Sequence, residues 1–256
     1  MLNSILPFTP EAAEKVSGYC IEHTNGVPKM MEEVWEYTAK SFKEADKMSS
    51  PLQGSWMIFL AQDRKAKRIL DIGTFSGYSA LAWYEGTRET HAEIITLEVS
   101  PEMIAVARGV FDKYNVNDRI TLIEGPAAES LEKLTGSFDL IFVDANKDGY
   151  EGYVNTILDR NLLSQDGLIM CDNVFARGMT ISTSSNPILA GSSRSYWTEC
   201  GKALRQFNAA VNQDPRIDVV MLPVFDGVSL IKLKNQTAEP EANGRNTTAS
   251  NGTNPI

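Results

Sequence analysis

From Arg68 onward the chain alternates short apolar runs with longer amphipathic segments. The runs are RILDIG (68–73), EIITLEV (93–99), RITLIEG (119–125), FDLIFVDA (138–145), GLIMCDN (167–173), RIDVVMLP (216–223) and VSLIKLK (228–234). The segments between them, at 78–86, 101–114, 127–134, 149–160 and 196–213, indicate helices. Because the runs are apolar almost throughout, both faces of the sheet should be covered, which is typical of parallel strands between two layers of helices.

The two ends of this pattern complete the predicted fold. Only PVFDG separates the last two runs, which is too short for a helical crossover, so we expect this final pair to be antiparallel. Three helical patterns precede the first strand, at 9–24, 29–45 and 51–65, and the first of them opens with Thr9 and Pro10. The sequence predicts an α/β fold, with a doubly wound, seven-stranded, mostly parallel sheet, an antiparallel last strand and N-terminal helices.

The length and composition indicate one domain with a tail. The chain has 256 residues, 43% of them hydrophobic, which is enough for one core. Residues 1–234 should form this domain. Residues 235–256 are rich in Asn, Thr, Gly and Pro and should be disordered, with the sequons at Asn235, Asn246 and Asn251 as accidents of composition.

The charge and the rare residue types exclude several classes of protein. A net charge of −9 argues against general nucleic-acid binding, because phosphates attract Lys and Arg. An odd number of cysteines, three, is poor material for disulfides and favours a reducing cytoplasm, and no run is long enough to span a membrane. The two histidines, His23 and His91, weaken a zinc site or a Ser-His-Asp triad.

A glycine turn follows the first predicted strand, in ILDIGTFSGYSAL. Gly73 and Gly77 would let the backbone approach a ligand at the carboxyl end of the sheet. Position 75 is Phe, so the pattern is not G-x-G-x-x-G and favours a ligand without a pyrophosphate. Glu98, twenty-seven residues after Asp71, is placed to bind a ribose diol. The alternative is a structural tight turn and a solvated Glu98.

Five motifs in consistent order resemble one enzyme family. They are DIGTFSGYSALA, GPAAESL, FVDANKDGY, CDNV and DPRIDVVMLPVFDGVSL. Together, from about Met48 to Lys234, they resemble the caffeoyl-CoA and catechol O-methyltransferases, the small metal-dependent class of S-adenosylmethionine enzymes with a Rossmann-like fold.

The resemblance implies a cofactor site and a homodimer. The cofactor residues it implies are Ser50, Asp71, Gly73, Ser79, Glu98, Pro126, Ala127 and Asp144. Among these, Asp71, Gly73 and Ser79 would surround the methionine moiety. Glu98 would bind the ribose, Pro126 and Ala127 the adenine, and Ser50, in MSSPLQG, a carboxylate. A dimer could use Met30, Met31, Trp35 and Tyr37, which could equally be ordinary core.

Two neighbouring strands end in polar residues. Asp144 ends the fourth strand, and Asp172 and Asn173 end the fifth, so three oxygen ligands should reach one ion. Oxygen ligands without His or Cys select a hard cation, Mg²⁺ first, with Mn²⁺ or Ca²⁺ as substitutes. The alternatives are a solvated turn capped by Asp148 and a simple Asx turn.

Lys147 resembles the general base of the family. A nearby dication and partial burial both disfavour its ammonium form, which would prepare it to accept a proton from a catechol hydroxyl. The phenolate would then attack the sulfonium methyl in line. Asn146 departs from the family, which usually carries Asp there, and Asp226 matches a family position near the site.

The segment 174–197 should carry acceptor specificity. It contains Arg177 and Arg194 as its only basic residues, so little would meet the phosphates of coenzyme A. We therefore expect a small vicinal diphenol as substrate, with a caffeoyl-CoA-type ester as the alternative. A non-catalytic nucleoside-binding module is a second alternative. An oxidoreductase is disfavoured because no Tyr-x-x-x-Lys pair is present.

Overall fold

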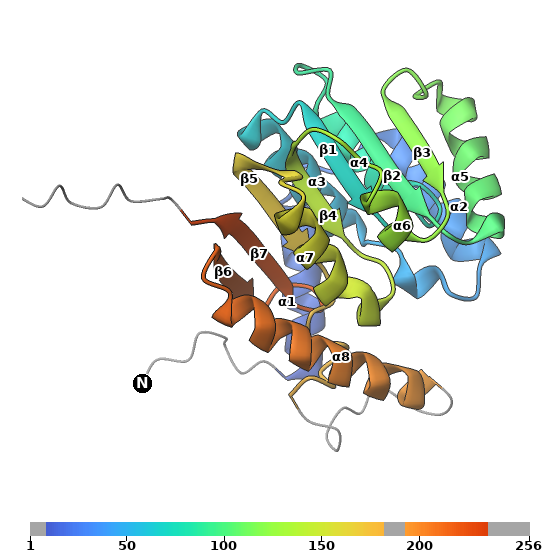
Figure 1. Cartoon of the computed structure of the whole chain (residues 1–256). Coiled ribbons are helices and arrows are strands. Elements are labelled where there is room, and N and C mark those ends of the chain that lie inside the picture. Colours follow the sequence, from blue (N-terminus) through green and yellow to red (C-terminus); the bar gives the residue numbers. More distant parts are fainter. Residues whose placement is uncertain (1–8, 182–192, 235–256) are drawn as a thin grey trace, which may run out of the picture.

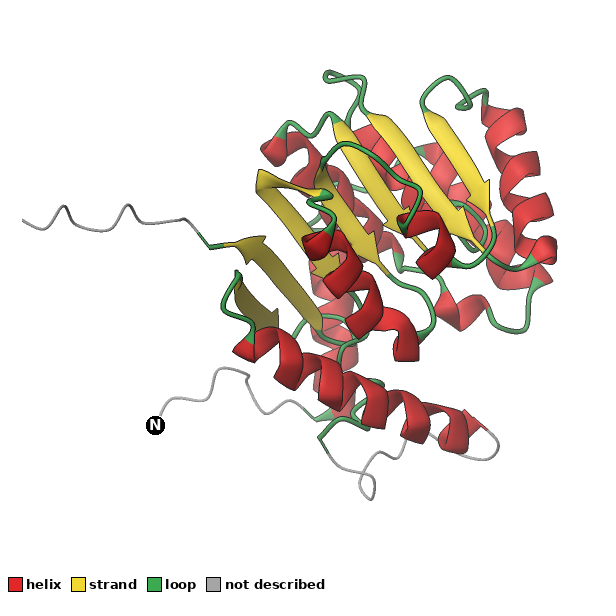
Figure 2. Ribbon diagram, in the orientation of Figure 1, coloured by secondary structure: helices red, strands yellow, loops and turns green. Residues whose placement is uncertain are grey.

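The protein is a three-layer structure in which helices cover both faces of one sheet (Figure 1, Figure 2). The computed structural model describes residues 9–181 and 193–234. The strands are β1 (Arg68–Ile72), β2 (Glu93–Glu98), β3 (Ile120–Glu124), β4 (Phe138–Val143), β5 (Leu163–Cys171), β6 (Ile217–Leu222) and β7 (Val228–Leu233). The helices are α1 (Pro10–Glu22), α2 (Lys29–Ser41), α3 (Pro51–Arg64), α4 (Tyr78–Gly86), α5 (Pro101–Tyr114), α6 (Ala127–Leu131), α7 (Tyr150–Asp159) and α8 (Ser193–Gln213), with 3₁₀ turns η1 (Ala45–Lys47) and η2 (Lys147–Gly149).

The predicted fold class is confirmed by the sheet topology. The strand order is β3-β2-β1-β4-β5-β7-β6, in which β1 to β5 pair in parallel and β7 is antiparallel to both β5 and β6. The strand order reverses between β1 and β4: the chain leads from β1 through β2 to β3 at one edge of the sheet, and from β4 through β5 toward the other edge. The carboxyl ends of β1 and β4 therefore flank the crevice where open α/β sheets bind ligands.

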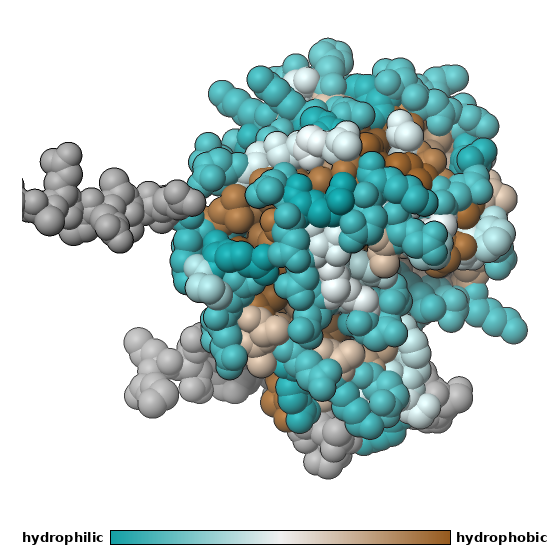
Figure 3. Space-filling view, viewed as in Figure 1, coloured by the Kyte–Doolittle hydropathy of each residue, from teal (hydrophilic) through white to brown (hydrophobic). Residues whose placement is uncertain are grey.

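Alternation along the strands builds two cores. On one face, Leu70, Ile72, Ile141 and Val143 pack with α6, α7 and α8, and on the other, Ile69, Leu140 and Phe142 pack with α2, α3, α4 and α5. Figure 3 shows a largely hydrophilic surface with hydrophobic atoms visible between its protruding polar groups. Both sheet faces are thus buried, as the near-continuous apolar runs predicted.

Several predicted boundaries were wrong. Strand β5 begins at Leu163, because Leu163 pairs with Phe138 of β4 ahead of a register shift, after which Leu168 pairs with Leu140. Helix α2 stops at Ser41, since Phe42 adopts an extended backbone, and α6 stops at Leu131. Local periodicity does not encode these ends, because pairing and packing with other elements decide them.

The N-terminal helices differ in their packing. The α2 residues considered for a dimer belong mostly to the core. Met31 is fully buried, Met30 and Trp35 are partly buried and pack against the core, and of these four residues only Tyr37 is exposed. Residues 11–22 of α1, in contrast, include none that is buried. Within residues 9–181 and 193–234, no helix is long and apolar enough to cross a membrane, and Cys20, Cys171 and Cys200 are free thiols. The predicted tail, 235–256, lies outside the described residues.

Candidate active site

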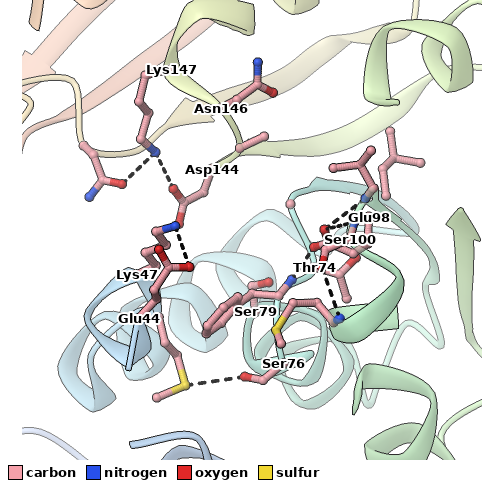
Figure 4. A pocket seen from close by; sticks show the side chains of 18 of the residues that line it. Glu44, Lys47, Thr74, Ser76, Ser79, Glu98, Ser100, Asp144, Asn146 and Lys147 are labelled. Atoms are coloured by element: carbon pink, nitrogen blue, oxygen red, sulfur yellow. Dashed lines mark hydrogen bonds and ion pairs between the residues drawn. The ribbon is translucent and has the colours of Figure 1, made fainter. Parts of the chain in front are cut away.

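A cavity of about 970 Å³ opens at the carboxyl ends of the parallel strands. Figure 4 shows Asp144 and Lys147 on one side of it and Glu98 and Ser100 on another. Eight residues predicted for the site line it: Gly73, Ser79, Glu98, Pro126, Ala127, Asp144, Lys147 and Asn173. The fold therefore joins residues from the carboxyl ends of five strands, β1 to β5, in one space.

The two glycines of the turn after β1 are required by packing against other parts of the protein. Gly73 has φ +107°, and a Cβ there would lie 2.1 Å from the carbonyl oxygen of Asp144. Gly77 has φ +91° and faces the ring of Phe111, which would lie 2.8 Å from a Cβ. Both positions need glycine for the backbone conformation as well as for the space. Gly73 in addition lets the ends of β1 and β4 approach each other beside the cavity.

Asp71 lies beneath the cavity rather than in its wall. Its carboxylate is fully buried and accepts hydrogen bonds from Ser79 Oγ (3.0 Å), Thr96 Oγ1 (2.7 Å) and Trp83 Nε1 (3.2 Å). Burial raises the pKa of Asp71 to about 7, against the lowering effect of these donors. Asp71 can act on a ligand through Ser79, which does line the cavity. The sequence offered no signal for Thr96 and Trp83.

The carboxylate of Glu98 is held by the backbone. Its Oε2 accepts from the amide of Phe75 at 2.8 Å, and its Oε1 accepts from the amides of Val99 and Ser100 at 2.9 Å each. These bonds fix the orientation of an acid that lines the cavity. The geometry leaves lone pairs for a diol, and the ribose contact stays a prediction.

Ser50 has a structural place in the fold. It is the N-cap of α3, where its Oγ accepts from the amide of Gln53 at 3.2 Å, and its side chain is exposed. Its neighbours Met48 and Ser49 line the cavity. The proposed carboxylate contact of Ser50 therefore stays a prediction, and the MSSPLQG segment reaches the cavity one residue earlier than expected.

The oxygens predicted to bind a metal converge on one nitrogen. Lys147 Nζ donates to Asp144 Oδ1 at 2.7 Å and to Asn173 Oδ1 at 2.8 Å. It also lies 2.8 Å from the hydroxyl of Tyr150, which donates to the carbonyl oxygen of Asp172 at 3.0 Å. The Lys147 side chain is 6% exposed. The Lys147 ammonium thus lies between two of the three predicted metal ligands, where it is attracted by the negative charge of Asp144 and donates to the amide oxygen of Asn173.

Asp172 lies behind this pair. It is 2% exposed, and its two carboxylate oxygens accept from the amide of Asn173 (2.7 Å) and from Gln53 Nε2 (2.6 Å). Burial, and then the negative charge of Asp144, raise the pKa of Asp172 to about 7. The contact with Gln53 has no sequence signal, because the two residues are 119 positions apart.

The wall opposite the strand ends comes from two further segments. Residues 41–49 contribute Met48, from the predicted MSSPLQG segment, together with Phe42, Lys43 and Lys47, which the sequence analysis missed. The other segment is part of the predicted specificity segment and contributes Arg177, Tyr196 and Trp197; residues 182–192 of that segment lie outside the described residues. Asp46 joins the two segments through an ion pair with Arg177 (2.5 Å). The sequence contains no signal for the start of the first segment, because the helical pattern continues to residue 45 whereas α2 ends at Ser41.

Asp226 anchors this wall from the β6–β7 connection. Both of its carboxylate oxygens accept from the amide of Arg177, at 2.8 and 2.9 Å, and it lines the cavity. Burial raises the pKa of Asp226 to about 6. The guanidinium of Arg177 also lies 4.5 Å from the ring centroid of Trp197, so one arginine holds an acid, a neighbouring segment and an aromatic ring.

Comparison with known proteins places this geometry in a family. A family model described as O-methyltransferase matches residues 21–234. The chain is 41% identical over 239 residues to O-methyltransferase ankF of Aspergillus thermomutatus, covering 93% of this chain and 100% of that protein. It is 33% identical over 210 residues to caffeoyl-CoA O-methyltransferase 1 of Eucalyptus globulus, covering 80% and 82%.

A solved structure agrees with the sequence relatives. The crystal structure of the SAH-bound Podospora anserina methyltransferase PaMTH1 superimposes with a TM-score of 0.90 and 62% identity, over 91% of this chain and 100% of that one. The resemblance carried by the five motifs is confirmed. The chain therefore belongs to the S-adenosylmethionine-dependent O-methyltransferases, in the class of the caffeoyl-CoA O-methyltransferases.

Proposed function

We propose that this chain moves the methyl group of S-adenosylmethionine to one hydroxyl of a vicinal diphenol with the help of a divalent cation, Mg²⁺ first and Mn²⁺ or Ca²⁺ as substitutes. The observation that carries the proposal is the convergence of Asp144 Oδ1 and Asn173 Oδ1 on the Lys147 ammonium. It lies in the same cavity as Glu98 and Ser79, the residues proposed for the methyl donor.

The residues present fit a hard cation. A positive group already lies within 2.8 Å of two side-chain oxygens, one from a carboxylate and one from an amide. Asp172, next to Asn173, would add a third oxygen. Within the described ranges, no group of three or more His, Cys, Asp and Glu side chains is arranged to hold a metal, so this site depends on the amide of Asn173. Oxygen-only ligation is the preference of Mg²⁺.

The chain's own residues provide the remaining chemistry. A bound cation would make a coordinated hydroxyl more acidic and stabilise the oxyanion. Lys147 in its neutral amine form is the proposed proton acceptor, and the Tyr150 hydroxyl, itself held by the Asp172 carbonyl, keeps Nζ directed toward Asp144. The cavity walls would hold acceptor and donor in one orientation, which is the main source of rate enhancement for such a transfer.

The structure favours a free phenol over a coenzyme A ester as acceptor. Four basic side chains line the cavity: Lys43, Lys47, Lys147 and Arg177. Three of them are already paired with acids: Lys47 with Glu44 (2.9 Å), Lys147 with Asp144 (2.7 Å) and Arg177 with Asp46 (2.5 Å). Little positive charge remains for several phosphates. Kinetics on caffeic acid, catechol and caffeoyl-CoA side by side test this choice, and far better use of the ester would reverse it.

The metal proposal is tested by mutation and chelation. Asp144→Ala and Asp172→Ala should abolish methyl transfer while circular dichroism still shows the fold, and excess EDTA should stop the wild type. Asp148→Ala, an exposed carboxylate in the same loop, is the matched control and should keep its activity. Full activity in EDTA or in either ligand variant would remove the mechanism. Donor binding without turnover in the wild type would instead favour a non-catalytic nucleoside-binding module.

We also infer a homodimer in a reducing cytoplasm. Helix α1 has thirteen residues, and Val16, Tyr19 and Ile21 are exposed on it. An isolated helix of that length is marginal in water, so a second copy of the chain would stabilise it. Light scattering after size exclusion should give the mass of a dimer, and a monomer at micromolar concentration would contradict the inference.

A further inference from the structure

Gln53 is a buried polar side chain on an otherwise apolar helix face. It is 4% exposed, and the other buried residues of α3 are Gly54, Met57 and Ala61. Burying an amide away from water is unfavourable unless the amide is hydrogen-bonded. The side chain of Gln53 makes such a bond: its Nε2 donates to Asp172 Oδ2 at 2.6 Å.

That bond determines how the Asp172 carboxylate is held. The other oxygen, Oδ1, accepts from the amide of the next residue, Asn173, at 2.7 Å. The peptide carbonyl of Asp172 accepts from Tyr150. Among the side chains of residues 9–181 and 193–234, Gln53 alone donates a hydrogen bond to this carboxylate, so removing it would leave one oxygen with no donor in a nearly closed space.

We propose that Gln53 is a positioning residue for the cation site, acting through Asp172. The inference rests on the proposed function, because Asp172 matters to the cation only if the cation binds there. A carboxylate fixed by a donor on one oxygen loses little rotational freedom when it binds an ion with its remaining lone pairs. Without the donor, the carboxylate can turn away, and partners of this kind contribute about 10- to 100-fold to metal affinity.

The test compares two glutamines of the same helix. Gln53→Met keeps the length of the side chain and removes the donor, and Gln62→Met is the control, since Gln62 is exposed on α3. Titration calorimetry with Mg²⁺ alone should show affinity about 10- to 100-fold weaker for Gln53→Met and unchanged for Gln62→Met. Raising the Mg²⁺ concentration should restore most of kcat to Gln53→Met, which a general loss of structure would not allow.

A second variant guards against misfolding. Gln53→Asn keeps an amide but is one methylene shorter, so it fits the space without reaching Asp172, and its Mg²⁺ affinity should fall in the same direction. Wild-type Mg²⁺ affinity in both Gln53 variants would overturn the positioning role alone. A wild-type protein that binds no Mg²⁺ and methylates fully in EDTA would overturn the proposed function together with it.

Discussion

Replacing Gly73 by alanine tests the contact between the ends of β1 and β4. The new Cβ would lie 2.1 Å from the carbonyl oxygen of Asp144 and 2.8 Å from its carbonyl carbon. Both partners are backbone atoms and cannot rotate away. The end of β4 must therefore move by at least about 1 Å to approach van der Waals contact.

The expected cost follows from two effects. An alanine held at φ +107° is strained by about 1–3 kcal/mol, and overpacking against a fixed backbone typically adds about 1–3 kcal/mol. The free energy of unfolding should therefore fall by about 2–6 kcal/mol. Since Asp144 is a proposed metal ligand, a displacement of this size should also lower kcat by about 100-fold.

Gly125→Ala is the matched control. Gly125 has φ +117°, nearly the same conformation, but nothing lies within 4 Å of its added Cβ. Urea unfolding should therefore show only the backbone strain, about 1–3 kcal/mol. The reasoning is refuted if Gly73→Ala is no less stable than Gly125→Ala and keeps its full kcat at saturating Mg²⁺ and donor.

Two further variants test the polar groups of the site. Lys147→Met should lower kcat by about 10²- to 10⁴-fold without changing the affinity for S-adenosylmethionine measured by calorimetry, because only the proposed base is lost; an unchanged kcat would contradict that role. Burial raises the pKa of Asp71 from 3.8 to about 7. Between these two pH values the folded state keeps a proton that the unfolded chain releases. The free energy of unfolding is therefore highest at about pH 4 with respect to this group, and it falls as the pH rises through 7. In urea unfolding, the wild type should lose up to about 4 kcal/mol relative to Asp71→Asn between pH 4 and 8, and parallel stability curves would disprove this.

Much of the fold was predictable because its signals are local. The apolar runs gave the seven strands, and the short PVFDG connection gave the antiparallel final pair, as the structure confirms. The start of β5 was not predictable, since Leu163 joins the sheet only by pairing with Phe138 of β4, across a register shift from the pair of Leu168 with Leu140.

Some residues of the candidate site were likewise predictable from local sequence, and others were not. Asp144, Lys147 and Asn173 were found because each follows a recognisable strand, and parallel strands end at one edge of a sheet. Gln53, Tyr150 and Trp83 were missed because each touches its partner only after the helices pack on the sheet.

By itself, the sequence determined the order of the elements, the family and the set of acids and amides at the strand ends, because periodicity and motifs are properties of neighbouring residues. Only the tertiary structure decided which of those groups lie in the cavity wall, which lie beneath it, and which donor holds each oxygen. The physical reason is that burial and hydrogen bonding depend on distances between segments, such as the 119 positions between Gln53 and Asp172, and no local pattern records them.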